Sequence, residues 1–141
     1  MPAPLTTADR LLRAARALFE REGAEAVSMR RVAAKAGVTP RSFTREELER
    51  RYVAAMVNEG AKVVAEGIAL RPLDVDVTLV HGYGFPRYKG GPMKYADLVG
   101  LPQILADIQA FAKEDPLFWQ PAPLLVQLVA EGKNFDSLNQ A

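Results

Sequence analysis

The sequence contains no cysteine and only one histidine, His81. Without cysteine, the chain forms no disulfide and offers no thiolate as a nucleophile or a zinc ligand. A single histidine also excludes a site in which several histidines of one chain hold a metal. No apolar run approaches the ~20 residues that a helix needs to cross a bilayer, and residues 1–4 lack the charged start of a signal peptide. These absences predict a cytoplasmic protein with no metal, no membrane partner and no thiol chemistry.

Length and composition are those of an ordinary globular protein. A chain of 141 residues, 49% hydrophobic and 25% charged, has the length of one domain and can bury roughly 70% of its unfolded surface. The net charge of +1 is unevenly spread, because residues 1–42 hold eight basic and four acidic side chains and residues 43–141 hold ten basic and thirteen acidic ones. The basic part is therefore a candidate for contact with a polyanion such as DNA, although a solvated helix surface has the same composition.

One stretch, residues 81–92, concentrates the residue types that shape loops. It contains four glycines, two prolines and three aromatic side chains within twelve positions. Glycine permits positive φ, proline fixes φ and ends a helix, and aromatic rings anchor a loop to the structure beneath it. The pattern predicts either a plain turn between two helices or a loop that contacts a ligand or a partner.

The first forty residues have the pattern of a helix-turn-helix. Thr6 or Thr7 is placed to cap a helix that ends at Gly23, and Ser28 is placed to cap a second helix that ends at Gly37. Apolar residues at three- and four-residue spacing predict the buried stripes, which are Leu11, Leu12, Ala15, Leu18 and Phe19 in the first helix and Met29, Val32, Ala33 and Ala36 in the second.

A third helix is predicted directly after this turn. The spacing from Ala33 to Gly37 is that of a helix-turn-helix corner, in which a small residue allows the next helix to approach. Thr39 would cap the third helix, Pro40 would lie in its first turn, and Phe43 would face inward.

These residues resemble the DNA-binding half of TetR-family regulators over positions 5–43. The matching runs are Ala14-Ala15-x-x-Leu18-Phe19-x-x-x-Gly23 and Val27-Ser28-Met29-Arg30-Arg31-Val32-Ala33-x-x-Ala36-Gly37-Val38-Thr39. The resemblance implies phosphate contacts for the residues near the start of the second helix and major-groove contacts for those of the third. The DNA-contacting residues that it implies are Ser28, Arg30, Arg31, Thr39, Arg41 and Ser42.

The sequence departs from the TetR pattern after Phe43. The family continues with an aromatic-rich turn before its fourth helix, whereas this chain passes directly to Thr44-Arg45-Glu46-Glu47-Leu48. The aromatic side chains that would seat the recognition helix are missing. Two carboxylates, those of Glu46 and Glu47, stand where phosphates would approach and oppose DNA electrostatically. The helix-turn-helix segment, here called the head, is therefore predicted to be truncated.

A long helix is predicted to begin at Thr44, since Glu47 completes a capping box with it. Asn58 and Glu59 interrupt its apolar pattern, and we expect them to form polar contacts within or between helices. The predicted apolar stripe of this helix, which continues to Ala69, consists of Leu48, Tyr52, Ala55, Met56, Glu59 and Val63.

The remaining chain is predicted to form short elements separated by proline and glycine. Pro72 ends the long helix, and Asp74 or Asp76 is placed to cap the next element. The alternation over residues 75–80 is typical of a strand by period alone. Further helices are predicted over residues 94–101, from Pro102 with the face Ile104, Leu105, Ile108, Phe111 and Ala112, and from Pro121 or Pro123 to Gly132 with the stripe Leu124, Leu125, Leu128 and Val129.

Residues 42–138 resemble the C-terminal helical domain of 3-hydroxyacyl-CoA dehydrogenases, most closely the last such domain of the large multifunctional β-oxidation enzymes. The resemblance is carried in order by Asn58-Glu59-Gly60-Ala61-Lys62, Glu66-Gly67-Ile68-Ala69, Asp74-Val75-Asp76, residues 81–92, Tyr95-Ala96-Asp97-Leu98-Val99-Gly100-Leu101, Asp115-Pro116, Phe118-Trp119 and Pro121-Ala122-Pro123-Leu124-Leu125, and ends near Phe135. It implies a helix, not a strand, over residues 75–80. The chain is thus predicted to be all-α, with a helix-turn-helix segment at 1–42 and a dehydrogenase-type helical domain at 43–141.

The resemblance also implies what the chain lacks. Hydride chemistry in this family needs a nicotinamide-binding Rossmann domain and a histidine–glutamate pair, and the run Gly82-x-Gly84 follows no buried strand of that fold. The catalytic copy of the helical domain supplies an asparagine about nine residues before the glutamate that matches Glu59. This chain has Arg50 there, so it resembles the second, non-catalytic copy. By resemblance the chain is inactive alone and binds no cofactor alone, although the family uses NAD and CoA thioesters.

Partner and ligand contacts are predicted in the glycine-rich loop. The non-catalytic copy packs on another helical domain, so the resemblance implies a homodimer or a dehydrogenase partner domain. Two other hypotheses stay open: a TetR-type regulator whose helical part serves for dimerisation and acyl-CoA sensing, and a dehydrogenase completed by another chain. The loop residues proposed for the interface or for an acyl-CoA phosphate are Tyr83, Phe85, Arg87, Tyr88, Lys89, Gly90 and Gly91.

Overall fold

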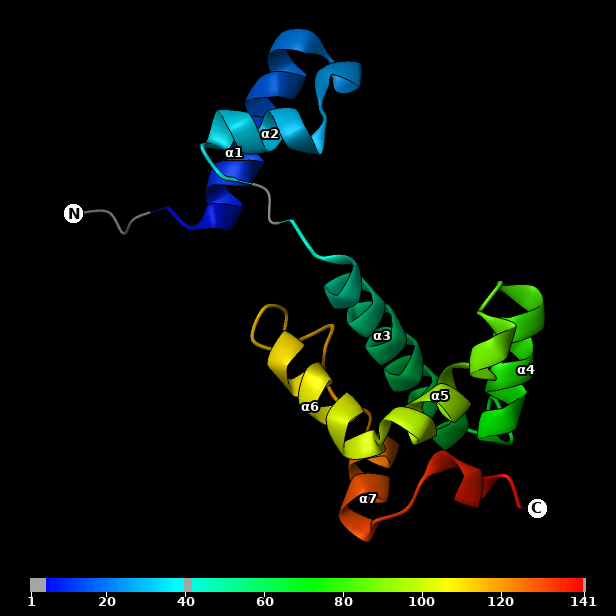
Figure 1. Ribbon diagram of the computed structural model, residues 1–141. Coiled ribbons are helices and arrows are strands. Elements are labelled where there is room, and N and C mark those ends of the chain that lie inside the picture. Colours follow the sequence, from blue (N-terminus) through cyan, green and yellow to red (C-terminus); the bar gives the residue numbers. More distant parts are fainter. Residues whose placement is uncertain (1–4, 40–41, 141) are drawn as a thin grey trace. The chain divides into compact units, whose positions relative to one another are not determined.

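The computed structural model describes residues 5–39 and 42–140, apart from the side chain of Ala26 (Figure 1). The described residues form helices and connecting turns without a strand, so the predicted all-α class is confirmed. Contacts within the chain divide it into two compact units, Met1–Phe43 and Thr44–Ala141. None of the helices in the described part is long and apolar enough to span a membrane.

The first unit contains α1 (Thr7–Glu22), a 3₁₀ turn (Ala24–Ala26) and α2 (Met29–Ala36). Thr6 caps α1 in a capping box with Asp9, and Ser28 accepts the backbone N–H of Arg31 to cap α2. Gly37 ends α2 in the left-handed conformation. The predicted caps and ends of both helices are confirmed.

The buried stripes of the first unit differ from the prediction. The small core consists of Ala14, Leu18 and Val32, with Leu11, Ala15, Val27 and Ala36 packed against it. Leu12 and Phe19 were expected in this core and are mostly exposed, as is Met29 at the first position of α2. Two helices bury only the residues that face each other, and a third layer is needed to cover the rest.

The predicted third helix is wrong for the residues that the structure describes. Thr39 and residues 42–44 lie in extended or irregular backbone, and Phe43 is exposed where an inward position was expected. Pro40 and Arg41 lie outside the described residues. The shortened sequence after Phe43 is consistent with this result, because it removes the turn that a recognition helix needs before the next helix starts.

The second unit is a bundle of five α-helices around one core. Its elements are α3 (Arg45–Ala65), α4 (Pro72–Gly82), a 3₁₀ turn (Arg87–Lys89), α5 (Pro92–Val99), α6 (Leu101–Phe111), α7 (Pro123–Glu131) and a final 3₁₀ turn (Phe135–Leu138). The predicted capping box of Thr44 and Glu47 is present. Residues 75–80 are helical, which confirms the choice of a helix there, and α3 ends at Ala65 where the prediction continued to Ala69.

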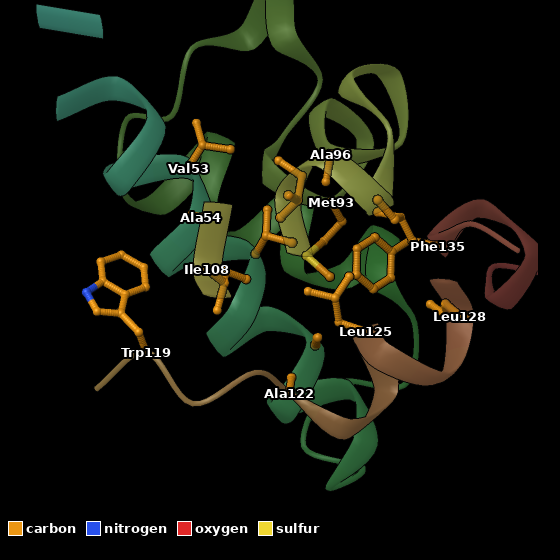
Figure 2. Packing of buried hydrophobic residues seen from close by; sticks show 14 of the residues in the cluster. Val53, Ala54, Met93, Ala96, Ile108, Trp119, Ala122, Leu125, Leu128 and Phe135 are labelled. Atoms are coloured by element: carbon orange, nitrogen blue, oxygen red, sulfur yellow. The ribbon is translucent and has the colours of Figure 1, made fainter. Parts of the chain in front are cut away.

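The core of this unit joins one side of α3 to α5, α6 and α7. Met93, Leu125 and Phe135 meet at its centre, and Trp119 closes it from the loop after α6 (Figure 2). The faces predicted for α6 and α7 are confirmed. On α3, however, the buried residues are Val53, Ala54, Val57, Asn58, Gly60 and Ala61. The stripe predicted there, from Leu48 to Val63, lies largely on the other side of the helix.

Candidate functional site

The glycine-rich loop connects α4 to α5 and is anchored by one aromatic ring. Phe85 is 2% exposed and stacks on Tyr52 of α3 with the ring centroids 6.4 Å apart. Tyr83 and Tyr88 are 73% and 86% exposed. Phe85 therefore anchors the loop to the structure beneath it, and only Tyr83 and Tyr88 among the predicted aromatic residues offer a surface to a partner.

The charged residues of the loop lie at its surface. Arg87 is exposed, whereas Lys89 is half-buried with its ammonium nitrogen 4.5 Å from the ring centroid of Tyr95. Gly90 is exposed and Gly91 is buried, with φ angles of 80° and 110°. Contact between these residues and a CoA phosphate stays a prediction.

Beneath the loop, Asp76 joins α4 to the start of α5. Its side chain is 4% exposed, and its two carboxylate oxygens accept the backbone N–H groups of Met93 at 2.7 Å and Lys94 at 3.0 Å. Burial raises the pKa of Asp76 to about 6, with a smaller contribution from Asp97, while the two backbone hydrogen bonds and Lys94 act in the opposite direction. The sequence predicted Asp74 or Asp76 as a cap of this helix. Asp74 completes the capping box with Arg71 at the start of α4, whereas Asp76 accepts the backbone N–H groups of Met93 and Lys94 in α5.

The raised pKa of Asp76 makes stability depend on pH. A carboxyl whose folded pKa exceeds its unfolded value stabilises the fold below the unfolded pKa of 3.8, and that contribution is lost as the pH rises through about 6. We expect the free energy of unfolding to fall by about 1 kcal/mol between pH 5 and pH 7 through this group. Urea denaturation of the wild-type chain and of Asp76→Asn at both pH values checks this. An equal pH dependence in the two proteins contradicts the assignment.

A groove of about 500 Å³, lined by both charged and apolar side chains, lies between α3, the loop, α5 and α6. Arg50 projects from α3 into it and donates two hydrogen bonds to the buried carboxylate of Asp107, one of them from Nε at 3.2 Å. This carboxylate raises the pKa of Arg50 above its already high ordinary value. Glu46 and Glu49 also line the groove. By the resemblance described above, Arg50 stands where the catalytic copy of the domain has an asparagine. At this position the chain thus holds an ion pair that attaches α3 to α6.

The outer side of α3 is apolar and carries a hollow along each edge. On the α4 edge, the apolar groove, of about 630 Å³, is lined by Met56, Glu59, Gly60, Val63, Ile68, Ala69, Leu70, Asp74, Val75, Thr78 and Leu79. On the other edge, the aromatic hollow, of about 540 Å³, is lined by Ala55, Met56, Asn58, Glu59, Lys62, Leu117, Phe118 and Trp119. Figure 1 shows α4 and the loop that follows α6 on the two sides of α3.

Large apolar side chains border both hollows and remain exposed. Ile68 and Leu70, in the turn after α3, are 73% and 84% exposed. Leu117 and Phe118, in the loop after α6, are 85% and 58% exposed. The residues predicted as a buried stripe of α3 belong to this surface: Leu48 and Tyr52 are exposed, and Met56 and Val63 are half-buried. The outer face of α3 therefore carries exposed apolar side chains outside the core of this unit.

The predicted DNA-contacting residues of the first unit lie at its surface. Ser28 caps α2, Arg30 is exposed, and Arg31 forms an ion pair with Glu22 at 2.6 Å. Thr39 and Ser42 are exposed but not on a helix. Arg41 lies outside the described residues. The structure thus provides no recognition helix among the described positions, and DNA contact stays a prediction.

Two features of the second unit were missed by the sequence analysis. Asp107 was not expected to be buried, and Leu117 and Phe118 were not recognised as surface residues. The sequence signal for the exposed turn that holds Leu117 and Phe118 is Asp115-Pro116. The side chain of an Asp at the start of a turn can accept the backbone N–H groups that follow it, as Asp115 does here. Within residues 5–39 and 42–140, no group of three acidic or histidine side chains is arranged to hold a metal.

Comparison with known proteins agrees with the two units. The family "Bacterial regulatory proteins, tetR family" matches residues 11–46, and "3-hydroxyacyl-CoA dehydrogenase, C-terminal domain" matches residues 49–138. Both resemblances found in the sequence are thus confirmed.

Three curated relatives illustrate the second match. The peroxisomal bifunctional enzyme of Danio rerio is 43% identical over 98 residues, which are 68% of this chain and 14% of the relative. The Homo sapiens protein of the same name is 39% identical over 97 residues, 67% of this chain and 13% of the relative. The fatty acid oxidation complex subunit alpha of Shewanella amazonensis is 34% identical over 100 residues, which are 70% of this chain and 14% of the relative.

The aligned region thus spans about one seventh of the length of these relatives. It consists of α3 to the final 3₁₀ turn, the unit that holds the core, the glycine-rich loop and both hollows. By this match over more than half of its length, the chain belongs to the family of the 3-hydroxyacyl-CoA dehydrogenase C-terminal domain.

Proposed function

We propose that the chain is a non-catalytic helical docking domain of the dehydrogenase type, fused to a partial DNA-binding head. In this proposal the outer face of α3 packs against a helical partner domain of the same class. The observation that carries the proposal is the exposure of Ile68, Leu70, Leu117 and Phe118 around the two hollows of this face.

An apolar face of this kind favours association. Burying apolar surface is worth about 25 cal/mol per Å², and the contiguous apolar patches of monomeric proteins are usually small. The second unit already has a complete core on the opposite side of α3, so the outer face is not needed to fold it. A partner domain that covers both hollows would remove these side chains from water.

The groove next to Arg50 supports a non-catalytic role. A dehydrogenase needs a general base within reach of the substrate hydroxyl and a bound nicotinamide. The groove instead holds the Arg50–Asp107 ion pair, with Gln103 donating a further hydrogen bond to Asp107 at 3.0 Å. The three side chains hydrogen-bond to one another, which supports a role in holding α3 on α6.

Two measurements with the purified full chain test this function. With NADH and acetoacetyl-CoA we expect no loss of absorbance at 340 nm, and steady oxidation of NADH would overturn the proposal. In sedimentation velocity we expect association with itself or with an added 3-hydroxyacyl-CoA dehydrogenase. The double change Ile68→Asp and Leu70→Asp should abolish that association, whereas Leu98→Asp, at a position that is 70% exposed on α5, should not. A chain that stays monomeric and binds no dehydrogenase contradicts docking.

A further inference from the structure

The groove next to Arg50 contains both paired and unpaired charges. Among the described residues, the charged side chains that line it are Glu46, Glu49, Arg50, Lys89 and Asp107. Arg50 and Asp107 form the ion pair described above. Arg45 donates a hydrogen bond to Glu49 at 2.9 Å, which holds the pKa of Glu49 below its ordinary value, and Lys89 adds a smaller effect. One acid and one base, Glu46 and Lys89, are left.

Glu46 and Lys89 form no ion pair, with each other or with any other residue of 5–39 and 42–140. Glu46 is exposed in the first turn of α3. Lys89 is half-buried, and the 4.5 Å contact of its ammonium with the ring of Tyr95 holds this charge in place. The contact engages no carboxylate, so the N–H groups of Lys89 are available to a ligand.

Arg50 offers a further donor to the groove. Asp107 accepts hydrogen bonds from Nε and from one terminal nitrogen of Arg50, and Gln103 donates to the same carboxylate at 3.0 Å. The other terminal nitrogen of Arg50 donates to no residue in the described part of the chain, and the side chain is 56% exposed. A guanidinium that a buried carboxylate already orders donates to a ligand with little further loss of conformational entropy.

The groove also has an apolar part. Val53 and Ile104, which are 7% and 3% exposed, are its most deeply buried apolar residues, and Tyr95 and Val99 of α5 line it as well. Its volume of about 500 Å³ lies within the range of about 300–1,000 Å³ that is typical of small-molecule sites. A small molecule with a charged end and an apolar body therefore finds partners for both parts.

We infer that this groove binds a free α-amino acid with an apolar side chain. Lys89 and the free end of Arg50 hold the carboxylate of the ligand, and Glu46 holds its ammonium group. A ligand with both charges matches one unpaired base and one unpaired acid, whereas a simple anion is repelled by Glu46 and a simple cation by Lys89. None of the residues that line this groove lines either hollow of the outer face of α3, so the inference is independent of the docking function.

Calorimetric titration of the full chain with L-phenylalanine and two analogues tests the class of ligand. The analogue 3-phenylpropanoate lacks the ammonium group, and 2-phenylethylamine lacks the carboxylate. We expect saturable binding of L-phenylalanine and binding at least about tenfold weaker for each analogue. Absence of saturable binding of L-phenylalanine up to about 10 mM overturns the inference. Equal affinity for either analogue also overturns it, because the groove then recognises one charge only.

Two charge-removing variants assign the roles of Glu46 and Lys89. Glu46→Gln should weaken the binding of L-phenylalanine about tenfold without weakening that of 3-phenylpropanoate, which has no group for Glu46 to hold. Lys89→Met should weaken both of these ligands about tenfold without weakening 2-phenylethylamine. The matched controls Glu66→Gln and Lys113→Met remove exposed charges that do not line the groove, and they should change no affinity.

Circular dichroism should show an intact fold for all four variants. Losses of L-phenylalanine binding that are equal in the controls and in the groove variants would contradict the assigned site, as would a Glu46→Gln variant that binds L-phenylalanine as tightly as the wild-type chain does.

Discussion

Replacement of Gly91 by alanine is expected to lower the free energy of unfolding of the second unit by about 4 kcal/mol. Gly91 has a φ of 110°, which an alanine adopts only with strain, and an added Cβ would overlap the Cβ and the carboxylate of Asp76. The neighbouring backbone cannot shift freely, because Asp76 is hydrogen-bonded to Met93 and Lys94. Urea denaturation followed by Trp119 fluorescence measures this unit alone, since Trp119 is the only tryptophan.

Gly84→Ala is the matched control for this prediction. Gly84 lies in the same loop with a φ of 72°, but no other heavy atom lies within 4 Å of the position its Cβ would take. We expect a loss of about 1 kcal/mol, the cost of the left-handed backbone alone. Equal losses for the two variants would mean that the overlap with Asp76 is relieved by movement, and the assigned role of Asp76 as a rigid support would be wrong.

Replacement of Asn58 by leucine is expected to destabilise the same unit by about 3 kcal/mol. The side chain of Asn58 is buried on α3, where it donates to the carbonyl of Gln120 at 2.9 Å and accepts the N–H of Ala122 at 2.8 Å. Leucine has a similar size and leaves both backbone groups without these hydrogen bonds in the interior. The loop after α6 would then lose its polar attachment to α3.

The control for Asn58 is a second asparagine that makes a comparable bond at the surface. Asn139 accepts the N–H of Leu73 at 2.9 Å in a solvent-exposed contact, so water can replace its oxygen. We expect Asn139→Leu to reduce the free energy of unfolding by less than about 1 kcal/mol. Thermal unfolding of both variants in parallel checks the pair, and similar losses would show that burial does not set the penalty.

Local signals predicted much of the fold correctly. The capping box of Thr44 and Glu47, the caps at Thr6 and Ser28 and the stop at Gly37 depend on interactions within a few residues, so the sequence contains them completely. The one-sided patterns of α6 and α7 were predicted for the same reason. The polar contact expected for Asn58 is present, although its partners lie more than sixty residues away.

The buried side was predicted wrongly in helices that carry apolar residues on more than one side. On α3, periodicity alone selects the stripe with Leu48, Tyr52 and Met56, while the core uses the opposite side, which contains Ala54 and Val57. The small residues of that second side allow close helix packing, and their value appears only when α5, α6 and α7 are in place. On α1, Leu12 and Phe19 were assigned to a core that needs one more covering layer.

By itself, the sequence determined the all-helical class, the caps of α1, α2 and α3, the ends of α1, α2 and α7 and the membership of the family, because these follow from local chemistry and from an ordered series of motifs. Tertiary structure alone decided which side of α3 is buried, since burial depends on what packs there. It also decided that Asp76 and Asp107 support neighbouring helices, and that Leu117 and Phe118 project beside a hollow on the edge of α3 opposite α4. These features join residues far apart in the chain, and no local pattern encodes such distances.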